Sequence, residues 1–121
     1  MKTILILEDE NIMLALLQRQ LEAEGYIVRV AEDGEKGLAM MREIKPDLVL
    51  LDIIMPKKDG FGVLEEKQKD EAIKDIPVII ISNSGQPVEL TRAQSLGVKD
   101  WLVKTEFDPQ EVKAKVKKQI G

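Results

Sequence analysis

The sequence predicts an α/β fold in which one parallel sheet of five strands is covered by helices on both faces, a (βα)5 arrangement. Short apolar runs rich in β-branched residues recur five times among the 121 residues, and the segments between them have helical periodicity. Alternation of this kind is typical of βαβ units. The apolar runs are residues 3–7, 27–31, 48–51, 77–81 and 101–103.

The composition fits one soluble domain and excludes several kinds of chemistry. With 121 residues, 44% of them hydrophobic, the chain can bury a core. Cysteine and histidine are both absent, which excludes disulfides, thiolate or histidine metal sites, histidine catalysis and a phosphohistidine on this chain. The net charge of −4 argues against direct nucleic-acid binding. Because no apolar run is long enough for membrane insertion, we expect a cytoplasmic protein.

The first predicted strand, residues 3–7, is followed by an amphipathic helix. The inward stripe of this helix is expected to contain Met13, Leu16, Leu17 and Leu21. Gly25 is expected to end the helix, because glycine readily adopts the left-handed conformation of a helix cap. Residues 27–31 form the next strand.

The next helix is expected to begin after Gly34 and to end before Pro46, which cannot continue it. Its inward residues are Leu38, Met41 and Ile44. The strand that follows, residues 48–51, is apolar at successive positions, as are residues 3–7 and 77–81. These three strands should therefore lie at the centre of the sheet, with helices covering both faces.

Two further helices flank the strand at residues 77–81. The helix before it should turn Phe61 and Leu64 inward, and the helix after it begins at Pro87 and ends at Gly97. The inward residues of this second helix are Leu90, Ala93 and Leu96.

The last strand, residues 101–103, leads to a helix that begins in the sequence "DPQE". Asp108 can cap this helix, Pro109 fits its first position, and Glu111 stands where a capping-box acid reaches back. Its inward residues are Val112, Val116 and Ile120. Strands and helices fill residues 1–121, so we expect one domain, with a functional crevice at the carboxyl ends of the strands.

Acidic side chains follow two of the central strands. Glu8 and Asp9 come directly after residues 3–7, and Asp52 comes directly after residues 48–51. If these strands are neighbours, three carboxylates converge and raise one another's pKa. A divalent cation relieves this repulsion, and Mg²⁺ prefers carboxylate, carbonyl and water oxygens. The sequence therefore predicts a magnesium site, and Mn²⁺ is a plausible substitute.

Four segments together resemble the receiver domain of two-component response regulators, of the single-domain, chemotaxis-regulator-like kind. They are "ILILEDE", "LVLLDIIMPKKDGFGVL", "VIIISNSG" and "DWLVK", and the resemblance covers essentially the whole chain. It implies a flavodoxin-like, doubly wound sheet in the strand order 2-1-3-4-5.

By position, the resemblance implies that Asp52 accepts a phosphoryl group from the phosphohistidine of a histidine kinase or a histidine phosphotransfer protein. Mg²⁺ would be bound by Asp9, Asp52 and the backbone carbonyl of Ile54, with Glu8 acting through water. Lys104 would pair with Asp52 in the unphosphorylated protein and with a phosphoryl oxygen afterwards. The Ser82 hydroxyl and the Asn83 backbone amide would contact the other phosphoryl oxygens. The domain would catalyse its own phosphorylation and dephosphorylation without turning over an external substrate.

Three positions depart from the family pattern. Trp101 stands at the aromatic switch position that acts with Ser82, where tyrosine or phenylalanine is usual, so it is either a switch or a static aromatic residue. Thr105 stands where the family usually has a proline joined to the preceding lysine by a cis peptide bond. A cis peptide bond before a residue other than proline costs about 2.5–4 kcal/mol. Asn83 replaces a small residue and, together with apolar Ile54, suggests restricted water access and slow loss of phosphate.

Output is expected to pass to a downstream protein through the face formed by the helix after Pro87, the strand at 101–103 and the last helix. A phosphorylation-independent receiver-like interaction module is the main alternative. A flavodoxin-like cofactor site is disfavoured, because "EDEN" after the first strand repels phosphate unless a metal intervenes. A haloacid-dehalogenase-type hydrolase would need an acid at Ile54.

Overall fold

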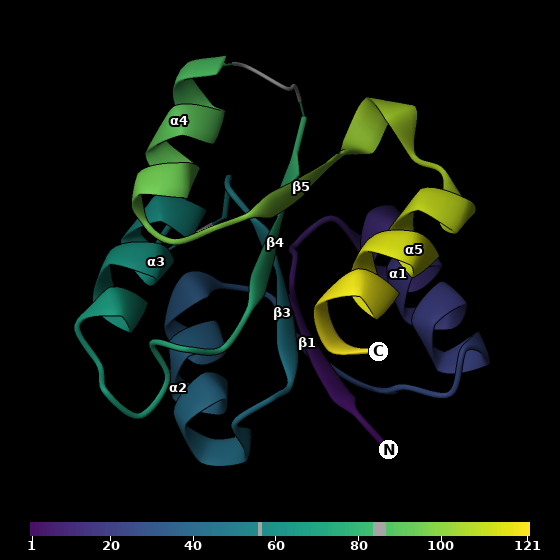
Figure 1. Ribbon diagram of the computed structural model, residues 1–121, viewed down its shortest axis with the longest axis horizontal. Coiled ribbons are helices and arrows are strands. Elements are labelled where there is room, and N and C mark those ends of the chain that lie inside the picture. The colour runs from purple at the N-terminus through teal and green to yellow at the C-terminus, as the bar shows by residue number, and fades with distance from the viewer. Residues whose placement is uncertain (56, 84–86) are drawn as a thin grey trace.

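The computed structural model describes residues 1–55, 57–83 and 87–121. Figure 1 shows a central sheet with helices on both sides. The strands are β1 (Thr3–Leu7), β2 (Ile27–Ala31), β3 (Leu48–Asp52), β4 (Val78–Ser82) and β5 (Asp100–Val103). The α-helices are α1 (Asn11–Ala23), α2 (Gly34–Ile44), α3 (Gly60–Gln68), α4 (Pro87–Ser95) and α5 (Pro109–Ile120), and a short 3-10 helix spans Lys104–Glu106.

The sheet has the order β2-β1-β3-β4-β5, and every neighbouring pair is parallel. This confirms the predicted fold class, the (βα)5 flavodoxin-like arrangement. The strand order reverses between β1 and β3, because the chain runs outward to β2 before it returns to the other side of β1. Side chains that follow β1 and β3 therefore meet at the carboxyl edge of the sheet.

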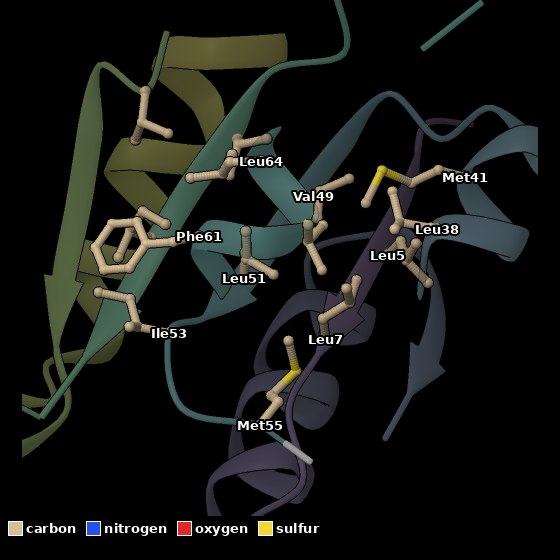
Figure 2. Close-up of a cluster of buried hydrophobic side chains, with 14 of the residues drawn as sticks. Leu5, Leu7, Leu38, Met41, Val49, Leu51, Ile53, Met55, Phe61 and Leu64 are labelled. Atoms are coloured by element: carbon tan, nitrogen blue, oxygen red, sulfur yellow. The ribbon is translucent and has the colours of Figure 1, made fainter. Parts of the chain in front are cut away.

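Two apolar clusters fill the space between the sheet and its helices. One cluster joins alternate residues of β1 and β3 to α2 and α3, and Figure 2 shows its members Leu7, Leu51 and Phe61 among the labelled side chains. The other joins the opposite face of the sheet to α1 and α5. Both faces of β1, β3 and β4 are buried, which confirms that these strands form the centre of the sheet.

The helix ends largely agree with the sequence. Gly25 and Gly97 have φ values of 94° and 92°, as left-handed caps require. The left-handed residue after α2 is Lys45, with a φ of 45°, directly before Pro46. Asp108 caps α5 by accepting a hydrogen bond from the backbone N–H of Gln110.

Some expected positions are wrong. Leu16 is 44% exposed and does not belong to the buried stripe of α1, which consists of Met13, Leu17 and Leu21. Ile44 and Leu90 are only partly buried, while Leu96 and Ile120 are partly buried but do pack against the two clusters, as expected. No helix within residues 1–55, 57–83 and 87–121 has both the length and the apolar character that crossing a membrane requires.

Candidate functional site

The carboxyl edge of the sheet brings together the residues that the sequence singled out. Glu8 and Asp9 follow β1, Asp52 is the last residue of β3, Ser82 is the last residue of β4, and Lys104 follows β5. Because β1, β3, β4 and β5 are successive neighbours in the sheet, these side chains gather at a single edge.

Three acids form the centre of this edge. Glu8, Asp9 and Asp52 each offer a carboxylate oxygen, and these oxygens lie within 4.8 Å of one another. Glu8 is fully buried and Asp52 is 3% exposed, whereas Asp9 is open to solvent. Buried β1 and β3 hold the two enclosed acids rigidly, so their repulsion cannot be relieved by moving apart.

Lys104 neutralises part of this charge. Its Nζ lies 3.0 Å from Oδ2 of Asp52, 2.9 Å from Oε1 of Glu8 and 3.2 Å from Oε2 of Glu10. The lysine side chain is only 8% exposed, so its pairs with the buried Asp52 and Glu8 are shielded from solvent, whereas Glu10 is 57% exposed. One ammonium thus faces three carboxylates. The resemblance implies the pairing with Asp52, but sequence reasoning misses the pairing with Glu10, because this acid directly precedes α1 and its direction depends on the turn after β1.

The electrostatics of the cluster shift two pKa values. Burial, aided by the neighbouring Asp52 carboxyl, raises the pKa of Glu8 to about 7, although Lys104 and the backbone N–H of Glu10 oppose the rise. Burial alone would lower the pKa of Lys104, but hydrogen bonds to Glu8 and Asp52 raise it above its ordinary value. Lys104 is therefore fully protonated at neutral pH, while Glu8 titrates there.

The donor set suits a hard divalent cation. Three carboxylates within reach of one point are an oxygen-only set of the kind that Mg²⁺ and Mn²⁺ accept. Oε1 of Glu8 is buried and, despite its ion pair with Lys104, receives no hydrogen bond from the described residues. Because a carboxylate oxygen has more than one lone pair, this buried acceptor can still receive a hydrogen bond from a metal-bound water. The residues present therefore fit a metal ion.

The loop after β3 is held close to Asp52. The backbone N–H of Ile54 donates a 3.3 Å hydrogen bond to Oδ1 of Asp52, while the Ile54 side chain is 65% exposed. A Cβ on Gly60 would lie 2.7 Å from the Asp52 carbonyl oxygen and 2.8 Å from Cα of Ile53. Only glycine allows this close approach of α3 to the end of β3. Pro56 lies outside the described residues.

The remaining expected residues surround this centre. Ser82 is 2% exposed at the end of β4, and Asn83 beside it is exposed. The peptide between Lys104 and Thr105 is trans, since the described residues contain no cis peptide. Lys104 therefore reaches the acids without the cis bond usual in the family.

Trp101 is half-buried on β5, and its backbone is tied to α5. Nζ of Lys115 donates to the Trp101 carbonyl oxygen and lies 3.0 Å from Oδ1 of Asp100. The same ammonium lies 6.0 Å from the centre of the indole ring. These contacts hold the strand against α5, and a switch role for the indole ring stays a prediction.

Replacing Asp52 with asparagine is expected to stabilise the metal-free protein. The substitution removes one negative charge from a group of acids that exceeds its single ammonium, so the free energy of unfolding should rise by about 1 kcal/mol. Chemical denaturation in EDTA measures this, with Glu43→Gln on the exposed face of α2 as the control. A lower unfolding free energy for Asp52→Asn would mean that the acids do not repel one another appreciably.

Known proteins share the sequence pattern of this chain. Residues 4–117 match the family model described as the response regulator receiver domain. The DNA-binding dual master transcriptional regulator RpaA of Synechocystis sp. is 38% identical over 97% of this chain and 48% of its own length. The chain spans less than half the length of the first three curated relatives, between 43% and 48%.

Solved structures agree with this match. A CheY-like response regulator receiver domain protein from Methanospirillum hungatei is 26% identical, with a TM-score of 0.90, and the superposition covers 99% of this chain and 94% of that one. The Mn(2+)-bound form of response regulator Rcp1 is 28% identical, with a TM-score of 0.81 over 94% of this chain and 88% of that chain.

Proposed function

Because the chain belongs to the response regulator receiver domain family, we propose that it is the phosphoacceptor domain of a two-component system, with Asp52 as the acceptor. The observation that carries this proposal is the set of contacts around Asp52. A buried carboxylate at a strand end lies 3.0 Å from a lysine ammonium and within 4.8 Å of two further acids. This arrangement supplies a nucleophile, an ammonium that can neutralise charge on a phosphoryl group, and acids that can hold a divalent cation.

In the proposed reaction, an oxygen of Asp52 forms a bond to phosphorus as the P–N bond of a kinase's phosphohistidine breaks. The electron pair of that bond stays on the imidazole nitrogen, and Asp52 becomes an acyl phosphate. No general base is needed, because a carboxylate has no proton to lose. The protein's contribution is to position Asp52 and to neutralise charge on the transferred group.

Lys104 is proposed to exchange partners during this reaction. Its ammonium pairs with Asp52, Glu8 and Glu10 in the present structure, and it would pair with a phosphoryl oxygen once Asp52 is modified. The Ser82 hydroxyl and the Asn83 backbone N–H, next along the edge at the end of β4, would bind the other oxygens. These new contacts would favour an active arrangement that the unmodified protein populates less.

Mg²⁺ is the proposed cofactor. Mn²⁺ is a plausible substitute, because the related response regulator Rcp1 has a solved Mn(2+)-bound form. Asp9, Asp52 and the Ile54 carbonyl would bind the ion, with Glu8 acting through water. When bound, the ion supplies positive charge to the phosphoryl oxygens.

Metal binding should also stabilise the fold. At ten times its dissociation constant, Mg²⁺ is expected to raise the free energy of unfolding by about 1.4 kcal/mol, since it binds the folded state alone. Chemical denaturation at a series of Mg²⁺ concentrations measures this. An Asp9→Asn variant should lose most of the effect, and an equal gain in wild type and variant would show that the ion binds elsewhere.

The partners and location follow from the same proposal. This domain would act in the cytoplasm, where a histidine kinase or a histidine phosphotransfer protein would supply the phosphoryl group. A downstream protein would bind the face formed by α4, β5 and α5. Lys115 and Lys113 of α5 already form ion pairs with Asp100 and Glu24, so Lys117 and Lys118, which are more exposed, are better candidates for partner contacts.

Phosphorylation itself is tested by intact mass after incubation with acetyl phosphate and Mg²⁺. The expected result is one added phosphoryl group, absent in EDTA and absent in Asp52→Ala. A short time course separates slow formation from rapid loss. If no mass is added at any time, a phosphorylation-independent interaction module becomes the better proposal.

A further inference from the structure

A second pocket lies at the edge of the sheet opposite to Asp52. It has a volume of about 400 Å³ and is lined by the carboxyl end of α3, the turn after α4 and the first residues of β4. Val78 lines the pocket and Ser82 ends the same strand, so the pocket and the phosphoacceptor edge are separated by about 13 Å along β4. The two sites are therefore spatially distinct.

One buried charge lines this pocket. Lys67 of α3 is only 4% exposed, and its Nζ donates a 2.8 Å hydrogen bond to the backbone carbonyl of Lys74. Over the described ranges, no carboxylate forms an ion pair with this ammonium. Two of its three donors thus have no acceptor among the described residues.

A buried ammonium without a counterion is unfavourable. Burial lowers the pKa of Lys67 to about 8, and the charge of Asp75 offsets only part of this effect. The turn before β4 needs only one hydrogen-bond donor from position 67, and an uncharged side chain such as glutamine can provide one. The positive charge of Lys67 is therefore not needed for its hydrogen bond to the Lys74 carbonyl.

The surroundings define what could pair with this charge. Leu64, Ile76 and Val98 supply apolar walls, and Leu64 and Val98 are 1% and 4% exposed. Lys74, Lys99 and Asp75 also line the pocket, but the Lys74 ammonium already pairs with Glu71 at 2.9 Å. The volume lies near the lower end of the range for small-molecule sites.

We propose that this pocket binds a small organic carboxylate, with its charged group paired to Lys67 and its short apolar body against Leu64, Ile76 and Val98. A carboxylate is favoured over a phosphate because one buried ammonium matches one negative charge, and because Leu64, Ile76 and Val98 give an organic body an apolar surface beside that ammonium. This site is independent of the proposed phosphotransfer, and Asp52→Ala should retain it.

The test uses hexanoate as the probe and hexanamide as its neutral counterpart, each titrated into the ¹⁵N-labelled full chain and followed by amide NMR. Hexanoate is expected to shift the Gly97 and Val98 resonances in a saturable manner at pH 7 and to bind at least about tenfold more tightly than hexanamide. At a pH of about 10, where Lys67 is neutral, this preference should disappear.

Variants locate the charge that is responsible. Lys67→Met keeps most of the side-chain volume and should abolish the preference for hexanoate, whereas Lys117→Met on α5 should keep it. The wild-type comparison of the two probes does not depend on the variant folding. Equal affinities for hexanoate and hexanamide, no saturable shift at Gly97 and Val98, or an unchanged preference in a folded Lys67→Met would each overturn the proposal.

Discussion

Lys104→Met is expected to lower the free energy of unfolding by about 3 kcal/mol or more at pH 7.5 in the absence of metal. The substitution keeps an apolar stem of similar length but removes the ammonium that lies within 3.2 Å of Asp52, Glu8 and Glu10. Two of these acids are buried, so water cannot replace the lost partner. Urea denaturation in EDTA measures the change.

Conditions that reduce the negative charge should rescue this variant. At a pH of about 5.5, where Glu8 is protonated, or with saturating Mg²⁺, the destabilisation should shrink clearly. Lys117→Met removes an exposed lysine of α5 and should change stability by less than about 0.5 kcal/mol. Equal destabilisation of Lys104→Met at both pH values would show that lost packing, not unpaired charge, is the cause.

The second large effect is a pH dependence that Glu8 imposes. Its pKa is about 7 in the folded protein and 4.5 ordinarily. Between these values the folded state holds a proton that the unfolded chain has released, so stability falls as pH rises. The free energy of unfolding of the metal-free protein should fall by roughly 3 kcal/mol between a pH of about 4.5 and 7. The stabilisation from the proton on Glu8 is fully present only below this range.

Unfolding free energies across this range in EDTA check the prediction, and Glu8→Gln should flatten the slope. Glu66 and Asp70 also have shifted pKa values, but these are lowered by Lys58 and Arg42 and act at lower pH. A slope that persists unchanged in Glu8→Gln would assign the pH dependence to another group.

The strands were the most predictable part of this fold. β1 and β2 have the predicted bounds, and β3, β4 and β5 differ by a residue at one or both ends. Their apolar runs are unbroken because both faces of the central strands are covered, a strong signal in sequence. The meeting of Glu8, Asp9 and Asp52 followed from topology alone, since parallel strands end at one edge.

Features that depend on side-chain direction were harder to predict. Leu16 fits the helical period of α1, yet it is 44% exposed because it lies at the margin of a narrow buried stripe. Glu10 lies in the acidic stretch "EDEN", where nothing in the sequence indicates its 3.2 Å contact with Lys104. Lys67 resembles any surface lysine in sequence, because its burial results from the turn that folds back over α3.

The proposed function is tested most directly by locating the phosphoryl group. After incubation with acetyl phosphate and Mg²⁺, borohydride reduces an aspartyl phosphate to homoserine, and tandem mass spectrometry of the peptides identifies the modified position. We predict homoserine at position 52 alone, and none when EDTA replaces Mg²⁺. Homoserine at position 9 instead, or phosphorylated protein without homoserine at position 52, would contradict the assignment of Asp52 as the phosphoacceptor.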